Sequence, residues 1–93
     1  MLKDKVKLAL RISNDFYDNE INGLIEACKK ELKLVGIASS NFYTSDYMIT
    51  QAVILYCKAN FGFDNSEADR YQKAYESLKS FLTLCPEYKE EEE

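Results

Sequence analysis

The chain has no histidine and no tryptophan, and only one proline and three glycines among its 93 residues. Without histidine, it lacks the commonest general base and the commonest metal ligand of proteins. It also has no nucleophile elbow, P-loop or glycine-rich phosphate loop. The scarcity of proline and glycine argues against a β-sandwich, which needs many turns. We therefore expect a helical protein that is not an enzyme and carries no cofactor.

The three cysteines are far apart in the chain, and no C-x-x-C pair occurs. Cys28, Cys57 and Cys85 fall on segments with an apolar helical face, where a free thiol behaves as a small hydrophobic side chain. Their spacing fits no zinc pattern. We expect free thiols and no metal, as in a protein of the reducing cytosol.

Long apolar runs are also missing. The first residues, "MLKDKVK", carry too many charges for the apolar region of a signal peptide. The longest uncharged runs, residues 34–45 and 47–57, are shorter than the roughly 20 residues that span a bilayer. We expect a soluble protein with no membrane association, made inside the cell.

Charge is unevenly distributed along the chain. The last seven residues, "EYKEEEE", contain five Glu and one Lys, so the net charge of −4 arises there and residues 1–86 are neutral. We expect a single helical domain over residues 1–86, followed by an acidic tail, residues 87–93, that is disordered when the protein is free. The first eleven residues are basic, with Lys3, Lys5, Lys7 and Arg11. Four cations at one end fall short of the sustained basic face of a nucleic-acid binder.

Apolar residues recur every three or four positions in four segments, which is the pattern of one helix face. The predicted helices cover about residues 2–11, 16–35, 47–60 and 66–85. The third has enough β-branched residues to raise the possibility of a strand, but its length and its flanking caps favour a helix. The fold class is therefore all-α, a small bundle of one short and three longer helices.

The helix ends carry recognisable signals. Gly36 follows the second helix as its natural C-terminal cap, and Ser45 or Asp46 can cap the third. Ser66 is expected to begin the fourth helix, with Asp69 three residues later as the partner of a capping box.

The charged stretch "YCKANFGFDNSEADRY", residues 56–71, separates the third helix from the fourth. Gly62 is a suitable residue to end the third helix, and Phe61 and Phe63 can pack under the joint. The acids that follow are explained as helix caps. We interpret this stretch as a joint and not as a catalytic loop.

The third helix has few polar residues, gathered in a narrow stripe through Thr50, Gln51 and Lys58. At 100° per residue, Ile54 and Leu55 flank that stripe. Two large aliphatic side chains there indicate that something covers them. The cover is expected to be either the first helix or a neighbouring subunit.

Two stretches carry a resemblance to a known family. The run "VKLALRISNDFYDNEINGLIEACKKEL" resembles the N-terminal signature of tailed-bacteriophage head–tail connector (DNA-packaging adaptor) proteins. The matching positions are Leu10, Arg11, Ile12, Asp15, Asp18, Ile21, Leu24, Ile25, Ala27 and Cys28. The run "ILYCKANFGFDNSEADRYQKAYESLKSFL" is similar to the same family as it occurs in phages and prophages of Gram-positive bacteria. The connection over residues 37–46 is shorter than in some relatives.

The resemblance implies a homo-oligomeric ring beneath the portal vertex, at the head–tail junction of the virion. The portal protein and the next connector or tail protein would be its partners, and double-stranded DNA would pass through its centre without sequence-specific binding.

The ring would close head-to-tail, so each subunit would offer two different faces. One face is expected to contain Ile54, Leu55 and Lys58. The basic first helix, with its residues Lys3, Lys5, Lys7 and Arg11, is expected to contribute to the other face or to the portal contact. The candidate docking tail comprises Glu87, Tyr88, Lys89 and Glu90, and Glu90–Glu93 near the channel would repel phosphate.

The residues leave two other classes open. One is a small helical adaptor or regulator that binds a single protein partner inside the cell. The other is a DNA-binding module that uses the basic first helix, against which the neutral charge of residues 1–86 argues. The sequence specifies neither the number of subunits nor the residues that line a channel.

Overall fold

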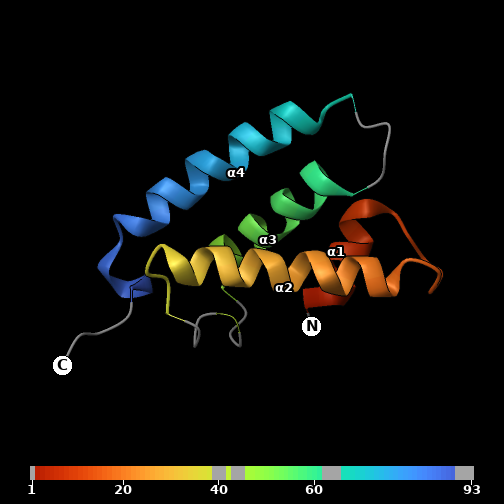
Figure 1. Ribbon diagram of the computed structural model, residues 1–93, viewed down its shortest axis with the longest axis horizontal. Coiled ribbons are helices and arrows are strands. Elements are labelled where there is room, and N and C mark those ends of the chain that lie inside the picture. The colour runs from red at the N-terminus through yellow and green to blue at the C-terminus, as the bar shows by residue number, and fades with distance from the viewer. Residues whose placement is uncertain (1, 39–41, 43–45, 62–65, 90–93) are drawn as a thin grey trace.

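In a computed structural model, the described part of the chain folds into four α-helices and a short C-terminal 3₁₀ turn (Figure 1). The structure describes residues 2–38, 42, 46–61 and 66–89. The elements are α1 (Leu2–Leu10), α2 (Asp18–Leu34), α3 (Tyr47–Asn60), α4 (Ala68–Thr83) and η2 (Pro86–Tyr88). The all-α prediction is confirmed.

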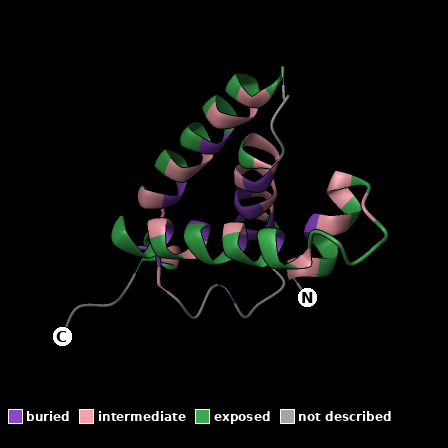
Figure 2. Ribbon diagram, turned by 45° about the vertical axis from the view of Figure 1, so that its right-hand side comes forward, coloured by how far each residue is buried: buried purple, intermediate pink, exposed green. Residues whose placement is uncertain are grey.

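The α3 helix lies at the centre of the fold. It packs most extensively on α4, and then on α2 and α1. Figure 2 shows the buried residues of α2, α3 and α4, in purple, along the parts of the ribbons that face the other helices. The buried residues of α3 are Ile49, Thr50, Ala52, Val53 and Cys57. A helix that is apolar on most sides has to be covered by several partners, and here three helices cover α3.

The α2 helix follows its predicted period closely, because Ile21, Ile25, Cys28 and Leu32 are all buried. Its bounds are two residues later at the start and one residue earlier at the end than predicted. Gly36 has a φ of 102°, in the left-handed region, as its predicted capping role requires.

The end of α2 is a Schellman motif. The backbone N–H of Gly36 donates to the carbonyl of Lys33 at 3.0 Å, and the N–H of Ile37 donates to that of Leu32 at 3.0 Å. Ile37 is itself buried, so the motif turns the chain back onto the core.

The start of α4 differs from the prediction. Ser66 and Glu67 form a turn, the helix begins at Ala68, and no side-chain hydrogen bond caps it. The predicted capping box of Ser66 and Asp69 is therefore wrong. The helix ends at Thr83, and Pro86 opens the separate turn η2. Gly62 and Phe63, predicted to form the joint, lie outside the described residues.

A polar cluster joins α2 to α4 beside the core. The buried Tyr75 hydroxyl donates to the carboxylate of Glu31, and the Nζ atom of Lys79 lies 3.5 Å from the same carboxylate. Cys28 and Cys57 are buried free thiols, as expected, and burial raises the pKa of each to about 12. Both thiols therefore stay protonated and unreactive at neutral pH.

Asp46 caps the central helix. Its carboxylate accepts a hydrogen bond from the backbone N–H of Ile49 at 3.1 Å, which confirms the predicted cap. The same carboxylate accepts the hydroxyl of Tyr88, at 2.9 Å to one oxygen and 3.1 Å to the other. This hydrogen bond raises the pKa of Tyr88 to about 12. One side chain thus connects the start of α3 to the C-terminal turn.

Residues 87–89, which the sequence assigned to the acidic tail, are folded against the body. The backbone N–H of Ala38 donates to the carbonyl of Tyr88 at 2.8 Å, and Ile37 forms an antiparallel bridge with Lys89. Glu87 is exposed on this turn, whereas Tyr88 is partly buried against the core. Residues 90–93 of the predicted tail lie outside the described residues.

We predict that Asp46→Ala lowers the free energy of unfolding by about 1–3 kcal/mol, because it removes both the helix cap and the acceptor of the Tyr88 hydroxyl. Urea unfolding followed by circular dichroism measures the change. Asp69→Ala is the matched control, since this exposed acid lies in the first turn of α4 but caps nothing. Equal stabilities of the two variants would contradict the role given to Asp46.

Candidate interaction surface

An open, mainly apolar hollow of about 360 Å³ lies between α1 and α3. Its lining residues are Lys5, Leu8, Ala9, Tyr47, Thr50, Gln51 and Ile54. Leu8 is 80% exposed and Tyr47 is 70% exposed, although both are large and apolar. A contiguous apolar surface of this kind is a common feature of protein–protein interfaces.

The helix α1 covers part of the stripe on α3 that the sequence singled out. Ile54 and Leu55 are half-buried and pack against the core. Thr50, expected on a solvent-facing stripe, is buried instead, and its hydroxyl donates to the carbonyl of Asp46 at 2.8 Å. The sequence left open whether the first helix or a neighbouring subunit covers this stripe. In the structure, the first helix covers part of it.

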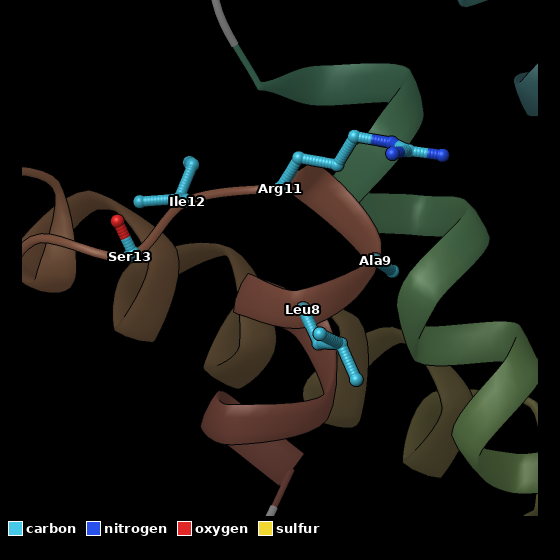
Figure 3. Close-up of a pocket in the computed structure, with 5 residues that line it drawn as sticks. All are labelled: Leu8, Ala9, Arg11, Ile12 and Ser13. Carbon is cyan, nitrogen blue, oxygen red and sulfur yellow. The ribbon is translucent and has the colours of Figure 1, made fainter.

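A second hollow, of about 420 Å³, opens where the C-terminal ends of α1 and α3 meet α4. Arg11 from the end of α1 and Lys58 from α3 both line it, together with Phe61 and Tyr71. The Nζ atom of Lys58 lies 5.3 Å from the centre of the Tyr71 ring. Figure 3 shows the Arg11 side chain extending from the end of α1 toward α3.

Residues that the sequence placed on two different faces therefore lie side by side. Lys5 shares the first hollow with Ile54, and Arg11 shares the second with Lys58. The first helix was one of the two covers expected for Ile54, but the pairing of Arg11 with Lys58 depends on how α1 crosses α3, which helical periodicity does not predict.

Arg11 has an unusual backbone conformation, with a φ of 61°. Its N–H donates to the carbonyl of Leu8 at 3.1 Å, and the N–H of Ile12 donates to that of Lys7 at 2.9 Å. This is the Schellman pattern, in which the left-handed position is usually glycine. A side chain there costs on the order of 1 kcal/mol, so the position of Arg11 is held at some expense of stability.

Of the four basic residues that the sequence assigned to a contact surface, Lys3 and Lys7 form ion pairs within the subunit. The Nζ atom of Lys7 lies 2.8 Å from Asp18 and 3.3 Å from Asp15, and Lys3 lies 3.4 Å from Asp18. The contact with Lys7 lowers the pKa of Asp18, and the contact with Asp18 raises the pKa of Lys7. Lys3 and Lys7 thus attach α1 to the start of α2, whereas Lys5 and Arg11 remain exposed.

Other large apolar side chains are exposed toward the two ends of α2. Phe16, just before α2, is 88% exposed, and Leu34, at its last position, is 78% exposed. Leu84, just after α4, is 80% exposed. Helical periodicity did not single out these residues, because they belong to the loops or fall outside the buried stripes.

Within the described ranges, no group of three or more potential ligand side chains could hold a metal ion. In the same part of the chain, none of the helices combines the length and the apolar character that crossing a membrane requires.

The ion pairs of Lys7 predict a specific pH dependence. A lowered pKa of Asp18 contributes stability at pH values above its unfolded pKa, near 3.8, and that contribution disappears as the pH falls through the folded pKa. Lys7→Met should therefore be less stable than the wild type near pH 7, and the difference should shrink as the pH falls below about 4.

Urea unfolding at several pH values measures this difference. Lys5→Met is the control, because Lys5 is exposed and forms no ion pair with the described residues. A difference between wild type and Lys7→Met that stays constant down to pH 3 would show that the ion pairs do not attach α1.

One family of known proteins matches the chain over nearly all of its length. Residues 1–89 match the family model described as "Phage connector protein", so the match includes all four helices and the C-terminal turn. No curated protein and no solved structure matches the chain. The match spans nearly the entire sequence, and the chain therefore belongs to the phage connector protein family.

Proposed function

We propose that this protein is a head–tail connector (adaptor) subunit that assembles into a ring of identical copies beneath the portal of a tailed phage or prophage. The ring bridges the portal to the next connector or to the tail, and double-stranded DNA passes through its centre. The role is structural and not enzymatic. The observation that carries the proposal is the family match over residues 1–89, which takes in every helix.

The exposed apolar residues support assembly. Leu8 and Tyr47 border the hollow between α1 and α3, and Leu34 lies at the other end of α2 from α1. Covering such side chains on association removes apolar area from water, at roughly 25 cal/mol per Å². Because these surfaces differ, they suit the head-to-tail contacts from which rings are built.

In the ring, the residues Ile54, Leu55 and Lys58 of α3 and Lys5 and Arg11 of the α1 region contribute to one continuous surface. This surface meets a neighbouring subunit or the portal. Lys3 and Lys7 contribute indirectly, since they hold α1 in place through Asp18. The subunits are made in the host cytoplasm and end at the head–tail junction of the virion.

Native mass spectrometry of the protein, alone and mixed with the portal protein encoded near it, tests the proposal. We expect a closed oligomer, or a portal complex that contains a ring of this chain. A strict monomer or dimer that ignores the portal would contradict the ring and would favour a small adaptor with one protein partner.

We predict that Leu8→Glu reduces assembly on the portal by at least about tenfold while the melting temperature changes little. Burial of a carboxylate at an interface is strongly unfavourable, whereas Leu8 contributes little to the monomer because it is 80% exposed. The measurement is the fraction of portal that carries the protein in native mass spectra. Ala74→Glu on the exposed side of α4 is the matched control, and equal assembly of both variants would exclude the α1–α3 surface.

A further inference from the structure

The hollow at the ends of α1 and α3 gathers positive charge around an aromatic ring. Arg11 and Lys58 line it, and the Nζ atom of Lys58 lies 5.3 Å from the centre of the Tyr71 ring. The guanidinium of Arg70 lies 5.3 Å from the same ring centre, but it does not line the hollow and is paired with Glu67. The lining is mainly polar, unlike that of the apolar hollow beside it. A concave site lined by two cations suits an anionic ligand.

Arg11 distinguishes this site from the other cations of the N-terminal region. Lys3 and Lys7 contact Asp18, but the guanidinium of Arg11 has no carboxylate partner among the residues that the structure describes. Arg11 is also exposed and occupies a left-handed position that usually carries glycine. Backbone conformations that are unfavourable for the residue present, such as that of Arg11, cluster at functional sites.

The chain itself supplies a matching anion. Its net charge of −4 arises in the last seven residues, and four consecutive glutamates, Glu90–Glu93, follow Lys89. The structure fixes where this segment begins, because Lys89 bridges Ile37 and the neighbouring Tyr88 donates to Asp46 at the start of α3. The acidic segment therefore leaves the body at the N-terminal end of α3.

The cationic hollow lies at the opposite end of α3, beside Lys58 and Phe61. The 14 residues of α3 separate the two ends by about 20 Å, at 1.5 Å per residue. Four residues in fully extended conformation span at most about 14 Å. The backbone of Glu90–Glu93 alone does not span this distance, whereas the hollow of a second copy placed beside Lys89 can lie within its reach.

We propose that Glu90–Glu93 of one subunit binds in the hollow formed by Arg11, Lys58 and Tyr71 of the next subunit. This inference rests on the proposed ring, and it identifies one of the contacts that closes it. Each subunit provides one acidic segment and one hollow, so the contact can repeat head-to-tail around the proposed ring. It also places the acidic segment at the interface between subunits and not in the DNA channel.

Each contact is weak alone, because ion pairs between exposed groups are weak and screened by salt. In an assembly, other surfaces hold the neighbour in place, so the segment binds at a high effective concentration. Duplex DNA is a less suitable ligand for the hollow, since residues 1–86 have no net charge.

A direct test uses the full chain and a synthetic peptide, EYKEEEE, as the probe. We expect the peptide to shift the NMR signals of Arg11, Lys58 and Tyr71 in the ¹⁵N-labelled protein, with an affinity that falls as salt rises. Arg11→Glu should weaken binding by about fivefold or more. Lys33→Glu is the matched control, because Lys33 is an exposed cation near the other end of α2.

Two outcomes of this test would overturn the proposal. One is the absence of shifts at the hollow, or equal shifts in wild type and Arg11→Glu. The other is that duplex DNA binds the hollow and the peptide does not.

Assembly on the portal gives the second test, with two charge-reversed proteins. One carries Arg11→Glu and Lys58→Glu, and the other carries Glu→Lys at all four positions 90–93. We expect each alone to assemble at least about tenfold less than the wild type. An equimolar mixture should recover assembly, because the reversed hollow matches the reversed segment and the two unchanged parts match each other.

This design separates the inference from the proposed function. If the wild type does not assemble with the portal, the proposed function fails. If the wild type and both variants assemble equally well, the ring stands and the docking of the acidic segment is wrong. Circular dichroism of each variant confirms that a loss of assembly is not a loss of folding.

Discussion

The structure depends on the burial of α3, a helix of 14 residues with few polar side chains. Such a helix is stable in water only when other elements cover most of its circumference. The helices α4, α2 and α1 each cover one sector of α3. The shortest of them, α1, contributes a single buried residue, Val6, so the cover is least complete along α1. The same constraint that organises the fold therefore leaves an apolar hollow open beside α1.

Polar contacts at the margins of the core fix how the helices are arranged. Lys7 connects α1 to Asp18 at the start of α2, and Asp46 connects the start of α3 to Tyr88 in η2. Each such contact contributes little to the net stability, because it replaces hydrogen bonds to water. Burial of apolar surface drives folding, while these contacts select the relative positions of the elements. The exact crossing of α1 over α3, on which both hollows depend, is therefore sensitive to a few exposed or half-exposed charges.

The sequence predicted most of the helical architecture, because helical periodicity is a local property. The buried positions of α2, the cap at Asp46 and the left-handed Gly36 follow from residue type and spacing. The start of α4 was placed two residues early, because Ser66 is a good capping residue that the turn does not use. The left-handed Arg11 was not foreseen, since that position usually requires glycine. The proximity of Arg11 and Lys58 depends on packing between helices, which no local pattern encodes.

The two ends of the subunit differ in chemistry, and this difference bears on how the proposed contact between subunits can repeat. The cationic hollow lies at the C-terminal end of α3, whereas the acidic segment begins near its N-terminal end. In a two-fold dimer, the acidic segment of each subunit would enter the hollow of the other, so opposite charges would pair there as well. A closed head-to-tail ring also pairs opposite charges at every contact, whereas an open chain of subunits leaves one hollow and one acidic segment unpaired. In the proposed ring each such contact is weak alone, so the entropy lost on association would favour free subunits until a portal held several of them together.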